Sequence, residues 1–227
     1  MKELQWDGAV NHLEVQALGP MTATNEMASS LDTIVIHLKA DTAYKRKFVA
    51  AFGSPLINTQ RILKALSQFV GSIVSSDSKY DKVKRGQAKF TVWEENGYNL
   101  FKTNCSGCHS EPLFTDNTFR NNGLALNAFT KDYGRMKVSG NPADSLKFKV
   151  PSLRNVAVTF PYMHDGRLYS LQSVLEHYTT GISAGPTLDT ILLRKIIFNK
   201  VQKMQLIAFL NALTDSTLLH DKRLGPN

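Results

Sequence analysis

Both cysteines of the chain lie within one pentapeptide, Cys105-Ser106-Gly107-Cys108-His109. The C-x-x-C-H spacing is the attachment signature of a c-type haem. Two thiols two residues apart on a helical turn match the two vinyl groups of a haem, and the next imidazole reaches the iron as proximal ligand. We therefore expect Cys105 and Cys108 to be thioether anchors and His109 to be the axial base.

Three other uses of the cysteine pair are weaker alternatives. A thioredoxin-like dithiol follows a strand in a βαβ unit, whereas residues 93–101 read as an amphipathic helix running into the motif. Zinc prefers four protein ligands and would have to recruit two distant histidines. A disulfide would enclose only two residues and gain little stability.

Composition sets the outer bounds of the fold. The 227 residues are 42% hydrophobic and 20% charged, which suits one good core or two smaller ones. No apolar run reaches the roughly 18 residues of a membrane helix, so we expect no membrane span.

The formal net charge is +8, and one basic cluster stands out: Lys79, Lys82, Lys84, Arg85 and Lys89. Such a cluster is usually a solvated face. The functional alternative is a docking surface for an acidic partner. No aromatic-basic motif or reading helix accompanies it, so nucleic acid is not an expected partner.

Helical patterns dominate, and no segment shows sustained period-two alternation, so we predict an all-α fold with long loops. Residues 56–73 carry apolar residues at helical spacing. A last helical region is expected from about Leu188 to Leu213, with a break near Asn199. Its predicted inward side consists of Leu193, Ile196, Ile197, Val201, Met204, Ile207 and Leu210.

A short helix is expected after Ser170, which can cap it. At 100° per residue, Tyr178 falls on the buried face of this helix and His177 points away from it. The loop over residues 110–169 is too long for a simple connector. Helices around a loop that wraps a flat ligand are typical of a cytochrome c domain.

Two long stretches after the haem motif carry a family resemblance: KFKVPSLRNVA at residues 147–157 and PYMHDGR at residues 161–167. They resemble the C-terminal haem domain of bacterial dihaem cytochrome c peroxidases and the related MauG-type enzymes. Residues 132–135, 139–144 and 206–214 fit the same pattern. The resemblance implies a C-terminal cytochrome c domain over residues 81–227.

The resemblance also reaches residues 6–8, 14–20 and 25–27. It implies that residues 1–80 are the remainder of a second, truncated cytochrome c-like domain, that of the peroxidatic haem, without its C-x-x-C-H. We therefore expect the chain to be a fragment of a larger enzyme. The family is periplasmic, although residues 1–7 lack the apolar core of a secretory signal.

The resemblance assigns roles to three N-terminal residues. Trp6 matches a position between the two haems that assists electron transfer. Gln16 and Glu26 match the polar pair beside the peroxide-binding iron, with Glu26 as the acid/base. The family's usual arginine after Trp-Asp-Gly is Ala9 here, which weakens whatever that cation contributes.

The distal ligand of the haem has several candidates. The family's ligand lies fourteen residues beyond the His of His-Asp-Gly, which gives Tyr178. Methionine occupies that position in the peroxidases, and tyrosine occupies it in MauG. Met163, in a loop that can fold back, is an alternative because Met/His ligation is common in cytochromes. His177 or an open site completes the set.

His164 and Asp165 are read as a structural turn rather than a catalytic pair. Family members also bind calcium, and the resemblance places backbone carbonyl ligands at Thr159 and Pro161, a donor type that suits this cation.

The expected function is that of an oxidoreductase reducing hydrogen peroxide through a covalent haem c. Its electrons would come from a small redox protein of the cytochrome c or cupredoxin type, and the family is compatible with a homodimer. The alternatives are a MauG-like dihaem oxidase and a monohaem electron-transfer cytochrome c. An apo-protein is a further alternative.

Overall fold

The computed structural model describes residues 3–225, which fold into two compact units. The N-terminal unit comprises residues 3–4 and 10–73, and the C-terminal unit comprises residues 5–9 and 74–225. Helices dominate both units, which confirms the predicted all-α class. Among the described helices, none combines the length and apolarity needed to cross a membrane.

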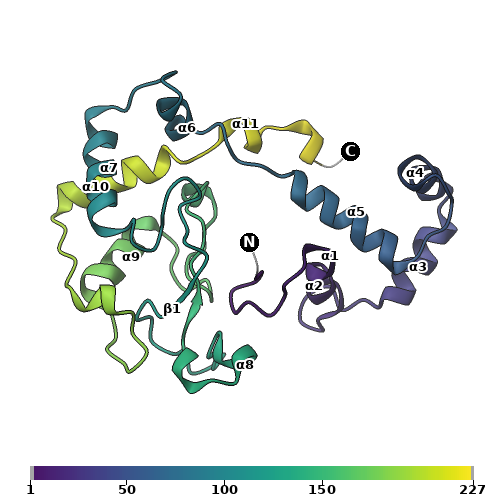
Figure 1. The fold of residues 1–227 in the computed structure, drawn as a ribbon, viewed down its shortest axis with the longest axis horizontal. Coiled ribbons are helices and arrows are strands. Elements are labelled where there is room, and N and C mark those ends of the chain that lie inside the picture. Colours follow the sequence, from purple (N-terminus) through teal and green to yellow (C-terminus); the bar gives the residue numbers. More distant parts are fainter. Residues whose placement is uncertain (1–2, 226–227) are drawn as a thin grey trace. The chain divides into compact units, whose positions relative to one another are not determined.

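The N-terminal unit is built from helices of 4–14 residues around a small apolar core. Its helices are α1 (Leu13–Gln16), α2 (Leu18–Thr22), α3 (Leu31–Ala40), α4 (Thr42–Phe52) and α5 (Thr59–Ser72) (Figure 1). Phe48, Ile57 and Ile62 are buried in the core. Asn58 starts α5 by accepting the backbone N–H of Arg61 at 3.0 Å.

Helix α5 confirms the helix predicted over residues 56–73, although only part of its apolar stripe is covered. Ile62 is buried, whereas Phe69, Val70 and Ile73 are 43–47% exposed. The helix α1 packs on α5 but has only four residues. It therefore offers too little apolar surface to cover the whole stripe.

The C-terminal unit carries most of the irregular chain. Its helices are α6 (Lys79–Lys84), α7 (Val92–Asn104), α8 (Met136–Ser139), α9 (Leu171–Glu176), α10 (Lys200–Asn211) and α11 (Ser216–Leu219). Short helical turns lie between and after them: η1 (Pro142–Asp144), η2 (Val156–Val158), η3 (His177–Gly181), η4 (Thr190–Leu193) and η5 (Lys222–Leu224).

The core of this unit lies where α7 and α10 cross (Figure 1). The crossing is close because Gly97 has no side chain: a Cβ there would lie 2.0 Å from the carbonyl oxygen of Gln205 and 2.9 Å from the Cβ of Phe209. Phe101, Phe114 and Phe209 are fully buried, with ring centroids 5.2–6.2 Å apart. Such tilted and edge-on ring pairs add to the stability gained from burial.

The last helical region differs from its prediction in extent and in face. Asn199 caps α10, so the break expected there is confirmed, but residues before it form only the turn η4 and extended chain. Four positions that we predicted to face inward are exposed, so the prediction is wrong for them: Leu193, Ile197, Val201 and Met204. Ile196 and Leu210 are buried, as predicted. A helical spacing counted across Asn199 does not predict the buried face, because a new helix begins at this cap.

The long loop predicted over residues 110–169 is confirmed. It contains two short antiparallel strands, β1 (Phe119–Arg120) and β2 (Phe148–Lys149), with Phe119 opposite Lys149. These strands tie together two parts of the loop that lie about thirty residues apart in the sequence.

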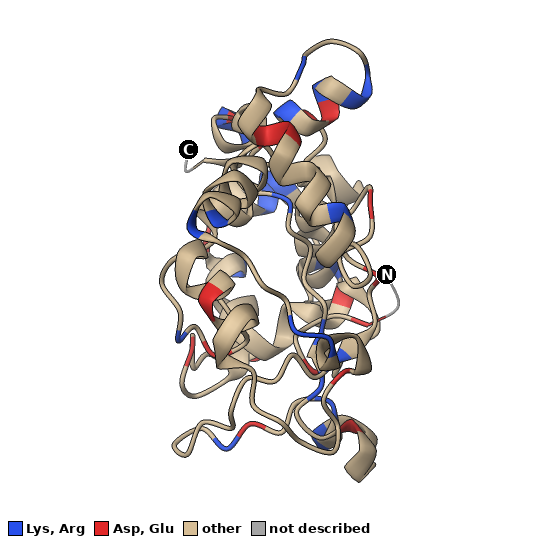
Figure 2. Cartoon of the chain, turned by 90° about the vertical axis from the view of Figure 1, so that its left-hand side faces the viewer, with Lys and Arg blue, Asp and Glu red and all other residues tan. Residues whose placement is uncertain are grey.

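Four of the five residues in the basic cluster around α6 are paired with acidic neighbours. Its ion pairs are Lys79–Glu94, Lys82–Asp77, Lys84–Glu111 and Arg85–Asp77. Figure 2 shows the same mixture, with blue and red segments alternating around this helix. The arrangement favours a solvated, locally paired face over a docking surface.

Candidate functional site

The C-x-x-C-H motif directly follows helix α7. Thr91 and Glu94 form a reciprocal capping box at its start, and the helix ends at Asn104. The turn then continues through the motif, since the N–H of Cys105 donates to Phe101 at 2.8 Å and the N–H of His109 donates to Cys105 at 2.9 Å. Both thiols are free.

The motif borders a cavity of about 360 Å³, within the roughly 300–1,000 Å³ of small-molecule and cofactor sites. Its lining comes from α7, the 148–164 loop, α9, η3 and α10, and belongs entirely to the C-terminal unit. Side chains such as Phe101, Leu175 and Leu206 make the walls largely apolar. A flat, mostly apolar macrocycle suits such walls.

The imidazole of His109 is oriented by the main chain. Its Nδ1 lies 3.0 Å from the carbonyl oxygen of Phe114 and 3.2 Å from that of Pro151. An Nδ1–H that donates to these carbonyls leaves Nε2 with a free lone pair, the arrangement of a metal-ligating histidine. Burial also lowers the pKa of His109, which keeps the ring neutral.

The two cysteines differ from a reactive dithiol. Burial, with a smaller contribution from Cys108, raises the pKa of Cys105 to about 12. Redox-active dithiols instead depend on a lowered thiol pKa. Within residues 3–225, no three His, Cys, Asp or Glu side chains are grouped closely enough to hold a metal ion.

Tyr178 lines the cavity from η3, a π-helical turn that directly follows α9. Ser170 caps α9 as predicted. Burial raises the pKa of Tyr178 to about 12, and a hydrogen bond from Asn122 opposes that rise. The prediction that Tyr178 faces inward agrees with this placement.

The position predicted for His177 is wrong. It is only 7% exposed, and its Nε2 lies 3.0 Å from the carbonyl oxygen of Asn122. The wider π-helical turn changes the angle between successive side chains, so His177 is buried as well, although of the two only Tyr178 lines the cavity.

Met163, the alternative ligand, also lines the cavity. Its backbone adopts a left-handed conformation with φ of 71°, and its sulfur accepts a hydrogen bond from Nδ2 of Asn122 at 3.3 Å. The structure thus places both candidate distal ligands at the same cavity.

Trp6 belongs to the C-terminal unit although it lies near the chain's start. It lines the cavity, and its carbonyl oxygen accepts the N–H of Lys149 at 2.7 Å. Gly8 fits closely beside it, with φ of 75° and room for no Cβ, since a Cβ would lie 2.4 Å from the Phe119 ring. Arg135 also holds this segment, because its side chain donates hydrogen bonds to the backbone carbonyls of residues 7 and 8.

The His-Asp-Gly segment is tied into the loop. The His164 ring stacks on Phe148 at 3.6 Å, and Asp165 forms an ion pair with Arg167. These contacts fit the structural turn that we predicted. Thr159 and Pro161 lie at the cavity as well.

Gln16 and Glu26 belong to the N-terminal unit and are not part of the cavity. Gln16 is half-buried at the end of α1, and Glu26 is exposed after α2. Gln16 and Glu26 therefore lie in a different unit from the haem motif.

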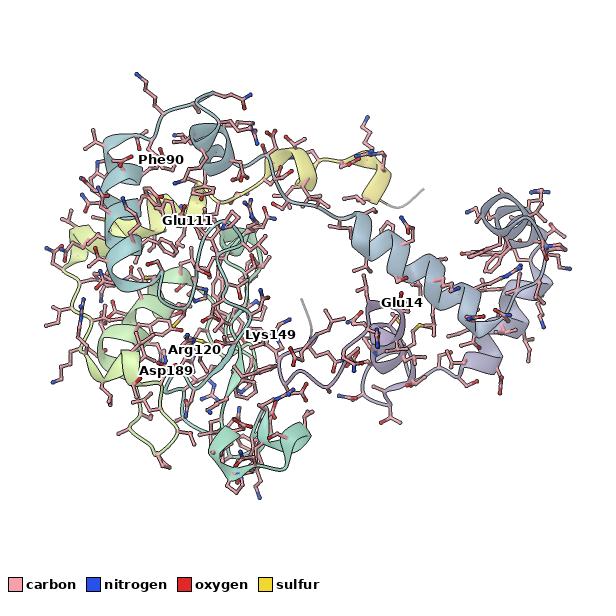
Figure 3. All side chains as sticks on the ribbon, in the orientation of Figure 1. Glu14, Phe90, Glu111, Arg120, Lys149 and Asp189 are labelled. Carbon is pink, nitrogen blue, oxygen red and sulfur yellow. The ribbon has the colours of Figure 1, made fainter. Side chains whose placement is uncertain are left out.

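Two polar features of the cavity were missed from the sequence. Asn122 contacts Met163 and Tyr178, as described above. Arg120 bridges Asp116 and Asp189, at 2.7 Å to each carboxylate, at the cavity wall (Figure 3). The only local signal was an Asn-Asn-Gly turn in the long loop, which does not distinguish a site from a bend.

Comparisons with known proteins identify the fold and its relatives. The family of di-haem cytochrome c peroxidases, CCP_MauG, matches residues 1–89. Methylamine utilization protein MauG of Methylorubrum extorquens is 36% identical over 215 residues, covering 92% of this chain and 60% of that protein. Cytochrome c551 peroxidase of Nitrosomonas europaea is 36% identical over 213 residues with the same coverages.

Solved structures agree with these matches. A MauG-like protein associated with microbial copper homeostasis superposes with a TM-score of 0.86 at 33% identity, covering 98% of this chain and 75% of that one. The diheme peroxidase BthA from Burkholderia thailandensis shares the fold, with a TM-score of 0.79 at 21% identity. The chain spans about 60% of the length of the two relatives named above. It belongs to the dihaem cytochrome c peroxidase and MauG family.

Proposed function

We propose that the C-terminal unit holds a covalent haem c and supplies electrons in a peroxide-reducing dihaem enzyme. The observation that carries this proposal is the arrangement of His109, whose Nδ1 is engaged by two carbonyls while Nε2 is left for a metal. The adjacent thiols and the apolar cavity are the surroundings that a thioether-linked haem requires. When bound, the haem supplies one-electron chemistry.

Each protein group has a distinct task in this proposal. Cys105 and Cys108 anchor the macrocycle, and His109 is the proximal ligand. Tyr178 is the distal ligand, with Met163 as the alternative, because both line the same cavity. Trp6 is the bridge toward a second haem, and the hydrogen bond from Lys149 holds its backbone at the cavity wall.

Peroxide reduction needs a group that moves protons. Glu26 is the acid/base in this proposal and Gln16 is its polar neighbour, as the family resemblance implies. A positioned acid/base contributes roughly 10²–10⁴-fold to a rate. Peroxidase relatives, including that of Nitrosomonas europaea, support hydrogen peroxide as the substrate.

The surroundings follow from the same family. We propose a periplasmic location, a small cytochrome c or cupredoxin as electron donor, and a homodimeric assembly. A calcium ion would take carbonyl oxygens of Thr159 and Pro161, a donor type that suits this hard cation.

A MauG-like oxidase is the second candidate. The observation in its favour is the placement of Tyr178 in the cavity with Asn122 beside its hydroxyl. An oxygen ligand distinguishes this site from the Met/His ligation of many electron-transfer cytochromes. A monohaem electron carrier is the third candidate, since the chain contains one C-x-x-C-H.

The ligand assignment is tested by spectroscopy. The full chain is produced with the haem attachment machinery, and optical and spin-resonance spectra are compared for wild type, Tyr178→Phe and Met163→Leu. Tyr178→Phe should change both spectra, and Met163→Leu should leave them largely intact. The reverse pattern would identify Met163, and not Tyr178, as the ligand of the iron.

Activity separates the candidate functions. Peroxide-dependent oxidation of a reduced small cytochrome is measured for this chain and for a form extended upstream to carry a second C-x-x-C-H. Each form is compared as wild type, Glu26→Gln and the control Glu14→Gln, whose exposed side chain lies on α1 (Figure 3). Turnover that falls about 10²-fold or more only in Glu26→Gln supports the peroxidase. Reversible redox cycling without turnover in both forms supports the electron carrier.

A further inference from the structure

Asn122 contacts every side chain considered as a distal ligand. Its Nδ2 lies 3.3 Å from the sulfur of Met163, and its side chain, which shares the cavity with Tyr178, acts to lower the pKa of the Tyr178 hydroxyl. Its carbonyl oxygen lies 3.0 Å from Nε2 of His177. One residue, two positions after the end of β1, therefore faces all three groups.

The amide of Asn122 has a defined orientation. Its Oδ1 accepts the N–H of Leu124 at 3.1 Å, which closes a local turn. With the oxygen used there, the NH₂ group faces the cavity, and its two hydrogens suffice for both Met163 and Tyr178. The carbonyl oxygen of Asn122 meanwhile accepts a hydrogen bond from the Nε2–H of His177. That nitrogen then has no lone pair for iron.

A hydrogen-bond donor affects the two remaining ligands in opposite ways. The oxygen of an ionised tyrosine carries charge, so a donor stabilises it strongly. The thioether of Met163 is neutral and only a weak acceptor. A donor on its sulfur draws away electron density that the sulfur would offer to a metal.

We propose that Asn122 is a positioning residue that selects Tyr178 over Met163 as the distal ligand, by stabilising the tyrosine oxygen and retaining the methionine sulfur. The inference rests on the haem site proposed above. It adds a residue whose side chain sets the choice of ligand without binding the iron.

The decisive variant is Asn122→Asp. A carboxylate still accepts the N–H of Leu124, so the turn is kept, but it offers no donor and places negative charge beside Tyr178. Since a hydrogen bond to a charged acceptor is worth roughly tenfold or more in an equilibrium, the ratio of tyrosine to methionine ligation should fall by at least about tenfold. The haem reduction potential should rise, because Met/His ligation raises it.

The measurements are optical spectra, spin-resonance spectra and reduction potentials of the haem-loaded full chain. Asn122→Leu is a second variant without a donor. Asn141→Asp is the matched control, because Oδ1 of Asn141 also accepts the N–H two residues ahead, at 3.0 Å, on an exposed turn. The double variant Asn122→Asp with Met163→Leu should lose the signals that Asn122→Asp gains.

Three results would overturn the proposal. One is a wild-type spectrum and potential in both Asn122 variants. Another is a spectrum of Asn122→Asp that Met163→Leu leaves unchanged. The third is loss of haem in both Asn122 variants but not in Asn141→Asp, which would assign Asn122 to folding. An unchanged Tyr178→Phe spectrum would instead refute the underlying ligand assignment.

Discussion

Nδ1 of His109 lies 3.0 Å from the carbonyl oxygen of Phe114, a residue whose ring is fully buried in the aromatic core. The core therefore positions the imidazole directly, through the main chain of one of its own members. Because a carbonyl cannot be altered by side-chain substitution, this orientation depends on the packing of Phe114 between Phe101 and Phe209.

Replacing His109 by Ala should remove the proximal ligand but keep the thioether links. We expect covalently bound haem in denaturing gels and complete loss of the histidine-ligated optical spectrum. His220→Ala is the control, since His220 is exposed on the last turn after α11. A wild-type spectrum in His109→Ala would remove His109 from the site.

Gly97→Ala should loosen the crossing of α7 and α10. The new Cβ would meet the carbonyl oxygen of Gln205 at 2.0 Å, which forces the helices apart. Overpacking of this kind costs about 1–3 kcal/mol, equivalent to a Tm lower by roughly 3–10 °C. Thermal unfolding followed by circular dichroism measures it, with Gly185→Ala as control because nothing lies within 4 Å of that position. Equal Tm values for the two variants would contradict the packing argument.

Gly8→Ala should release residues 5–9 from the C-terminal unit. Both the φ of 75° and the 2.4 Å approach to Phe119 disfavour a side chain there. The readout is hydrogen exchange at the N–H of Lys149, which donates to Trp6 and should exchange at least tenfold faster. Gly140→Ala separates the two causes, since Gly140 has a φ of 68° but no neighbour within 4 Å. Unchanged protection of the Lys149 N–H would show that residues 5–9 stay bound to the C-terminal unit, which would contradict the prediction.

The ion pair between Asp81 and Arg154 should make stability depend on acid pH. Burial tends to raise the pKa of Asp81, but hydrogen bonds from Arg154 and Ser78 outweigh it and lower the pKa from 3.8 to about 2. A lowered folded-state pKa adds stability above about pH 4, and that stability is lost as the pH falls toward 2.

Asp81→Asn should therefore lower the free energy of unfolding by roughly 1–2 kcal/mol at pH 7, with solvent screening included, and flatten its decline between pH 4 and 2. Urea unfolding at several pH values measures this. Glu95→Gln, an exposed change in the first turn of α7, serves as reference. Parallel pH profiles for wild type and Asp81→Asn would rule out a role for the ion pair.

The local features were predictable because their causes are local. The C-x-x-C-H spacing indicates haem attachment without any knowledge of the fold, and caps such as Ser170 and Asn199 mark helix starts through contacts within three residues. Positions that depended on an uninterrupted helical period were less predictable. Leu193 and Ile197 lie before the cap of α10, where no helix continues the phase.

The sequence by itself thus predicted an all-α chain, a C-x-x-C-H motif at residues 105–109 and an inward Tyr178. Only the tertiary structure brought Trp6 to the cavity wall, turned His177 inward through a π-helical turn, and set Asn122 between Met163 and Tyr178. The placements of Trp6 and Asn122 join segments far apart in the sequence. Loop closure and packing against distant neighbours decide such contacts, and no local pattern records them.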